Sequence, residues 1–102
     1  MNISEIINQL VDDIGIVDDV SYLKASEFVF QVFEEMRQKL ELQNKMSGIV
    51  PEVPDEEFGK VLRLGALAHM FKHYRDNANA EGTYYLYREA LIQYRARQRA
   101  SA

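Results

Sequence analysis

The hydrophobic pattern is densest over residues 54–74, which read PDEEFGKVLRLGALAHMFKHY. Asp55 and the two glutamates after it stand where a helix begins, because the first turn offers unpaired N–H groups and the positive end of the helix dipole. The apolar residues that follow recur at helical spacing but spread too widely for one narrow stripe. They are Phe58, Val61, Leu62, Leu64, Ala66, Leu67, Ala68, Met70, Phe71 and Tyr74. The pattern predicts a central helix covered on more than one side, and Gly65 would let a neighbouring helix approach closely.

Two helices are predicted before the central one. The first covers residues 4–13, where Asn2 and Glu5 have the spacing of a capping box. The second covers residues 22–45. Its segment 28–33, FVFQVF, alternates like a strand in isolation, but the apolar positions continue at helical spacing into strong helix formers, which favours a helix. The residues expected on its inner face are Ala25, Val29, Val32, Met36 and Leu40.

The rest of the chain predicts two connections and a last helix. Residues 48–54 hold both prolines and are expected to form an extended link. Residues 75–82 have the composition of a loop, because Asp, Asn and Gly favour turns. The last helix is expected over residues 83–97, with Tyr85 and Ile92 turned toward another chain. Its inner face is expected to hold Tyr84, Tyr87, Leu91 and Tyr94.

Length and composition fit one small all-α domain. The chain has 102 residues, of which 47% are hydrophobic and 27% charged, as in ordinary globular proteins. We therefore predict a small bundle of about four helices over residues 1–94 and an extended, basic C-terminal arm over residues 95–102. No cysteine is present, which excludes disulfides and thiolate metal sites. The N-terminal residues lack the features of a signal peptide and no apolar run reaches membrane-span length, so we expect no export and no membrane partner.

The net charge of −4 hides an uneven distribution along the chain. Residues 1–57 carry thirteen acidic and four basic side chains, a balance of −9, whereas residues 58–102 carry three acidic and eight basic ones, a balance of +5. Two interpretations stay open. The acidic and basic regions could meet in neighbouring copies of the protein, or the charges could only solvate separate faces.

Candidate chemistry is sparse. His69 and His73 stand four residues apart on the central helix, a spacing at which two imidazoles can share a zinc ion, but a stable site needs further ligands. The glutamate of an HExxH motif is missing, and there is no nucleophile motif and no glycine-rich phosphate loop. We therefore expect no enzyme, no metal and no cofactor, and interpret both histidines as partly buried, hydrogen-bonded side chains.

The last helix carries the features of a binding surface. Tyrosine is typical of protein interfaces because it combines an apolar ring with a polar tip. Tyr85, Arg88 and Ile92 are the predicted subunit interface, and Tyr94, Arg95, Arg97 and Arg99 the predicted partner-binding residues. For the basic end itself, three interpretations remain: a frayed tail, an arm ordered by docking on an acidic partner, or a phosphate-binding element.

Three segments resemble the head-tail adaptor, or head-completion, proteins of tailed bacteriophages. They are SEIINQLVDDIGIVDD (4–19), VPEVPDEEFGKVLRLGALAHMF (50–71) and YYLYREALIQYRAR (84–97). The likeness covers nearly the whole chain and lies in patterns and lengths. It implies a helical bundle that works as a homo-oligomeric ring beneath the portal, commonly a dodecamer, in the neck of the virion.

The resemblance also implies partners. Residues 94–102 would be the portal-binding arm, tail or nozzle proteins would bind the other side of the ring, and DNA would pass through only as cargo. The ring would assemble in the host cytoplasm. Two other classes remain as alternatives: a small regulatory or inhibitory protein that binds a host protein, and nucleic-acid binding through the basic end.

Overall fold

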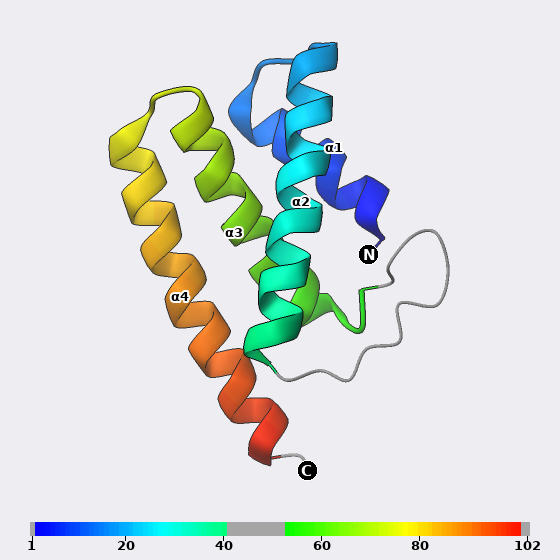
Figure 1. The fold of residues 1–102 in the computed structure, drawn as a ribbon, viewed down its shortest axis with the longest axis vertical. Helices are drawn as coiled ribbons and strands as arrows, with labels where there is room; N and C mark the ends of the chain where they lie inside the picture. Colours follow the sequence, from blue (N-terminus) through cyan, green and yellow to red (C-terminus); the bar gives the residue numbers. More distant parts are fainter. Residues whose placement is uncertain (1, 41–52, 101–102) are drawn as a thin grey trace.

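Four helices make up the part of the chain that the structure describes, residues 2–40 and 53–100 of a computed structural model. They are α1 (Ile3–Ile14), α2 (Asp19–Lys39), α3 (Glu56–His73) and α4 (Asn77–Ala100) (Figure 1). No strand occurs in these two ranges. The prediction of an all-α bundle is therefore confirmed.

Side-chain caps explain where the first three helices begin. In each case an Asn or Asp just before the helix accepts a hydrogen bond from a backbone N–H of the first turn, a contact that contributes about 1 kcal/mol. The pairs are Asn2 with Glu5 (2.9 Å), Asp18 with Ser21 (2.7 Å) and Asp55 with Phe58 (2.7 Å). Gly15 ends α1 in the left-handed conformation with φ 82°, which glycine adopts without strain.

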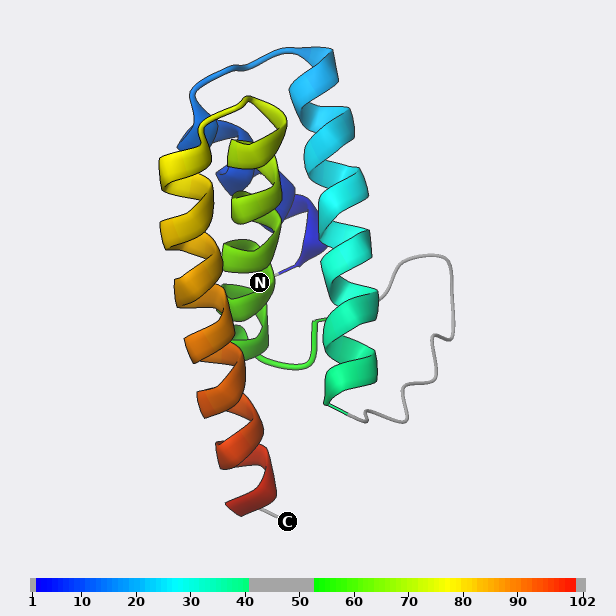
Figure 2. The same cartoon turned by 60° about the vertical axis from the view of Figure 1, so that its left-hand side comes forward.

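Helix α3 is the centre of the bundle. It contacts α4 on one side and both α1 and α2 on the other (Figures 1 and 2). Its buried residues cover more than half of its circumference, with Phe58, Leu62 and Met70 on one part and Val61 and Ala68 on another, while Glu56, Lys60 and Lys72 stay exposed. The prediction that this helix is covered on more than one side is confirmed.

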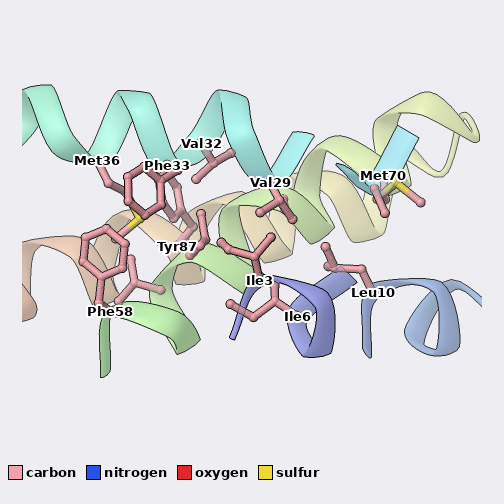
Figure 3. Close-up of a cluster of buried hydrophobic side chains, with 14 of the residues drawn as sticks. Ile3, Ile6, Leu10, Val29, Val32, Phe33, Met36, Phe58, Met70 and Tyr87 are labelled. Carbon is pink, nitrogen blue, oxygen red and sulfur yellow. The ribbon is translucent and has the colours of Figure 1, made fainter. Parts of the chain in front are cut away.

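The core fills the space between the four helices. Figure 3 shows side chains from α1, α2, α3 and α4 pointing into one shared apolar cluster. Ala25, Val29, Val32 and Met36 of α2 are buried, as the helical spacing predicted, and Leu40 packs against the core from its edge. Tyr87, Leu91 and Tyr94 of α4 are also buried. Tyr84 was predicted to face inward but is 43% exposed, so that prediction is wrong.

The boundary between α3 and α4 also differs from the prediction. Residues 77–82 were expected to be a loop but form the first turns of α4, and buried Ala80 contributes to packing. Asp76 explains the difference, because its carboxylate accepts hydrogen bonds from the backbone N–H (3.4 Å) and the side-chain amide (2.7 Å) of Asn79. Asparagine and aspartate stabilise helix starts as well as turns, so composition alone did not separate the two cases.

The chain reverses after α3 without a glycine. Arg75 takes the left-handed conformation with φ 61°, and its backbone N–H bonds the carbonyl of Lys72 (3.0 Å) while that of Asp76 bonds the carbonyl of Phe71 (2.8 Å). This is the hydrogen-bond pattern of a Schellman turn, in which glycine is usual.

The other ends of the predicted elements are placed as follows. Helix α2 begins at Asp19, three residues before its predicted start. Its predicted end at Lys45 and most of the proline-containing link lie in residues 41–52, outside the described residues. Helix α4 continues unbroken to Ala100, so residues 95–100 of the predicted C-terminal arm are the last turns of a helix that reaches past the ends of α2 and α3 (Figures 1 and 2).

Candidate docking surface on the last helix

Three contacts hold α4 against the rest of the bundle. The Tyr87 hydroxyl donates to Glu35 Oε1 on α2 (3.1 Å), and the Tyr94 hydroxyl donates to Asp55 Oδ2 just before α3 (2.9 Å). Arg97 adds an ion pair with Glu57 of α3 (3.5 Å). These contacts reach α2 and the start of α3, so they fix the part of α4 between Tyr87 and Arg97.

Burial and the neighbouring carboxylates keep both of these tyrosines protonated. Loss of water, reinforced by the charge of Glu35, raises the pKa of Tyr87 far above its usual value of 10. Burial and the hydrogen bond to Asp55 raise the pKa of Tyr94 to about 12. Both hydroxyls therefore remain hydrogen-bond donors at neutral pH.

The outer face of α4 carries the residues predicted as a subunit interface. Tyr85 is 63% and Ile92 59% exposed, and Arg88 is exposed beside them. Within the described residues, Arg88 has no carboxylate partner, and the same holds for Arg95 and Arg99. The result is an outward surface with both apolar area and uncompensated positive charge, whose role as an interface remains a prediction.

One side of this face forms a groove with the end of α2. Lys39 of α2, Leu40 directly after it and four residues of α4 line a hollow of about 350 Å³. The α4 residues are Arg88, Leu91, Ile92 and Arg95. We call this hollow the basic groove. Lys39 is paired with Glu35 (3.1 Å), which leaves the two arginines as its uncompensated charges. Apolar walls with a cationic rim suit a protein segment that combines apolar and acidic side chains.

A second hollow, of about 530 Å³, lies between α3 and the start of α4. Its lining includes Ala68, His69 and Lys72 of α3 and Asn77, Glu81 and Tyr84 of α4. His69 stacks on Phe28 of α2 with ring centroids 5.3 Å apart, while His73 meets the edges of Phe28 and Tyr74. The prediction of two partly buried, hydrogen-bonded histidines is therefore only partly right: His69 is half-buried but His73 is exposed, and within the described residues both make ring contacts and no hydrogen bond. Among residues 2–40 and 53–100, no three His, Asp or Glu side chains are close enough together to hold a metal ion.

The position of His69 predicts a dependence of stability on pH. Burial lowers the pKa of His69 below its usual value of 6.5, Lys72 acts in the same direction, and Glu35 opposes them. The folded protein therefore binds fewer protons near pH 6 than the unfolded chain. As a result, the free energy of unfolding should fall as the pH drops below about 6.5, by at most about 1.4 kcal/mol per pH unit for this one group.

Urea unfolding at pH 8, 6 and 5 tests this prediction. We expect His69→Gln to show a shallower pH dependence than the wild type, whereas His73→Gln, at an exposed position of the same helix, serves as the control. Equal slopes for the wild type and His69→Gln would contradict the prediction.

The structure separates the predicted partner-binding residues into two groups. Tyr94 is only 4% exposed, which agrees with its predicted place on the inner face of the helix, and its hydrogen bond to Asp55 positions α4. Arg97 and Arg99 are exposed, Arg95 is half-buried at the groove, and only Arg97 has an ion pair within the described residues. The surface they offer to a partner is therefore made of arginines and lacks the tyrosine ring.

Sequence reasoning missed the basic groove. Arg88, Ile92, Arg95 and Arg99 follow the helical spacing i, i+4, i+7, i+11 and so share one face of α4, a signal that was present in the sequence. The contribution of Lys39 and Leu40 could not be found in this way, because it depends on where the end of α2 lies relative to α4.

Comparisons with known protein families, curated proteins and solved structures found no match for this chain. None of the four described helices is both long enough and apolar enough to cross a membrane. The candidate surface is therefore interpreted from its own residues.

Proposed function

We propose that this protein is a structural adaptor that joins larger protein assemblies by docking through the end of α4. One observation carries the proposal: the last turns of α4 extend past α2 and α3 as a preformed helix (Figure 2), on which Arg97 and Arg99 are exposed and Arg95 is half-buried at the basic groove. Arginine is enriched in protein interfaces, where its planar group pairs with carboxylates. A preformed helix also loses less conformational freedom on binding than a loose tail.

The setting that we propose is the head-tail junction of a tailed bacteriophage. The chain would form a homo-oligomeric ring beneath the portal, the end of α4 would grip the portal, and tail proteins would bind the opposite side. The resemblance of residues 4–19, 50–71 and 84–97 to head-tail adaptor proteins supports this setting, as does the division between an acidic first half and a basic second half. The activity is assembly, and no catalytic step is part of it.

Light scattering tests the proposal. We expect the purified protein to form rings on the portal protein of the same phage, so that the mass of the complex exceeds that of the portal alone by several times the 11.8 kDa of the chain. A one-to-one complex with a host protein, without ring formation, would instead favour a small regulatory or inhibitory protein. Steeply salt-dependent binding to DNA would favour nucleic-acid recognition.

A pair of variants assigns the contact to the end of α4. We expect Arg97→Glu with Arg99→Glu to weaken portal binding at least about tenfold, because two attractive charges become repulsive. Lys60→Glu with Arg75→Glu is the matched control, since it changes the net charge equally and also removes a cation that pairs with Glu57. Equal binding by both double variants would contradict the proposed contact.

A further inference from the structure

The turn between α1 and α2 forms a second exposed apolar surface, far from the basic groove. Val17 is 66%, Val20 55% and Leu23 59% exposed, and Asp18 and Asp19 are exposed between them. We call these five residues the acidic corner. Exposed apolar side chains gathered at one place on a small protein typically mark an interaction surface.

The acidic corner and the basic groove lie at opposite ends of α2. The corner includes the first residue of the helix, Asp19, and the groove includes its last, Lys39. A helix of 21 residues is about 30 Å long. One copy of the chain therefore cannot bring its own corner to its own groove (Figure 1).

We infer that the acidic corner of one copy docks in the basic groove of a second copy. The two surfaces are complementary in both charge and polarity. Asp18 and Asp19 match the uncompensated Arg88 and Arg95, and the exposed valines and leucine match the apolar wall that includes Ile92. Opposite charges across an interface favour encounter and fix its register. The inference deepens the proposed ring-forming adaptor and rests on it.

Some of the other charges of the chain are paired within one copy. Arg63 of α3 bonds Asp13 of α1 (2.7 Å), and Arg97 pairs with Glu57. The division of charge along the sequence is therefore partly neutralised inside the bundle. At the acidic corner and the basic groove, Lys39 apart, the charges are not neutralised by ion pairs within the described residues of one copy. This favours these two surfaces as the pair that meets between copies.

The contact is heterologous, because it joins two different surfaces. A copy bound through its corner still has a free groove, and its neighbour has a free corner. Such head-to-tail contacts add further copies and close a ring when the rotation between neighbours allows it. A groove of about 350 Å³ is small, so one contact by itself should be weak, and ring closure and portal docking would add to it.

Three double variants test the inference by analytical ultracentrifugation from about 1 to about 500 µM, a range that covers weak contacts. The groove variant is R88E/R95E, and the corner variant is V17N/D19N. The control L86N/E89N changes one exposed apolar and one acidic residue on a side of α4 away from the groove. All changed side chains except the half-buried Arg95 are exposed, and circular dichroism verifies folding.

We expect the groove and corner variants each to raise the concentration needed for assembly at least about tenfold, with the control near the wild type. An equimolar mixture of the groove and corner variants should form one-to-one dimers that do not grow. The dimer arises because the groove variant keeps an intact corner and the corner variant keeps an intact groove. If either variant alone dimerised at the concentrations at which the wild type assembles, the inference would be overturned.

Cysteine cross-linking provides a direct second test, since the chain has no native cysteine. We expect V17C mixed with I92C to form a mixed disulfide faster than either variant cross-links to itself. V17C mixed with L86C, on the other side of α4, is the control. Equal rates for both mixtures would overturn the contact.

The two proposals fail in different ways. If the groove variant and the corner variant both assemble as well as the wild type, this contact is overturned but the adaptor proposal is not. A wild type that stays monomeric throughout would overturn the contact, and its failure to form rings on the portal would overturn the adaptor.

Discussion

Replacement of Gly65 by valine is expected to lower the free energy of unfolding by about 3 kcal/mol, because the site has no room for a side chain. A Cβ atom at Gly65 would lie 2.6 Å from Val32 Cγ1 of α2 and 2.8 Å from Tyr87 Cε1 of α4. Real Cβ atoms do not approach other atoms this closely, so the buried Val32 or Tyr87 side chain, or the helix that carries it, must move. Gly65→Ala should also destabilise, since overpacking of about 1–3 kcal/mol outweighs the gain of about 1 kcal/mol in helix propensity.

Gly82 offers the matched control. It is also inside a helix, but a Cβ atom there would meet nothing within 4 Å, and its backbone is not left-handed. We therefore expect Gly82→Ala to raise the free energy of unfolding by about 0.5–1 kcal/mol through helix propensity alone. Denaturant unfolding of the three variants measures both effects. A Gly65→Val variant as stable as the wild type would show that α2, α3 and α4 are less closely packed than the structure has them.

The close approach at Gly65 also bears on the candidate surface. Val32 and Tyr87 belong to α2 and α4, the two helices that form the walls of the basic groove. A side chain at position 65 would push these helices apart. We therefore expect Gly65→Val to weaken assembly of the protein as well as its folding.

The helices and their inner faces could be predicted because they follow from local spacing. The dense apolar pattern of α3 indicated a central helix, and the small residue at Gly65 indicated close packing. The start of α4 could not be predicted from composition, because Asp76 and Asn79 suit a turn and a helix cap equally well. The inward prediction for Tyr84 failed because the two helices do not close over its ring, which lines an open hollow together with Ala68 and His69 of α3.

The candidate surface was predictable only in part. The exposure of Tyr85 and Ile92 followed from the helical period of α4, which placed the buried residues on the opposite side. The basic groove needed the end of α2, about fifty residues earlier in the chain, to lie beside α4. A helical pattern shows which face is outward but not which neighbour borders it.

Replacement of Phe58 by alanine should have the largest effect on stability. Phe58 is fully buried and meets the ring of Phe33 of α2 edge to face at 5.4 Å (Figure 3). On its other side it meets the ring of Tyr94 of α4, also edge to face, at 5.9 Å. Removing a buried phenylalanine ring typically costs about 3–5 kcal/mol, since apolar burial is lost and a cavity remains. A domain of this size is usually stable by only about 5–15 kcal/mol.

Phe30→Ala is the matched control, because the same ring is removed from the outer face of α2, where Phe30 is 40% exposed. We expect it to cost no more than about 1 kcal/mol. Hydrogen exchange adds a local measurement. Phe58→Ala should also accelerate amide exchange around Tyr94, because that part of α4 loses its packing against the start of α3. If Phe58→Ala cost no more than Phe30→Ala, the three rings would not be what holds the end of α4 in place, and the proposed docking helix would lack its rigid support.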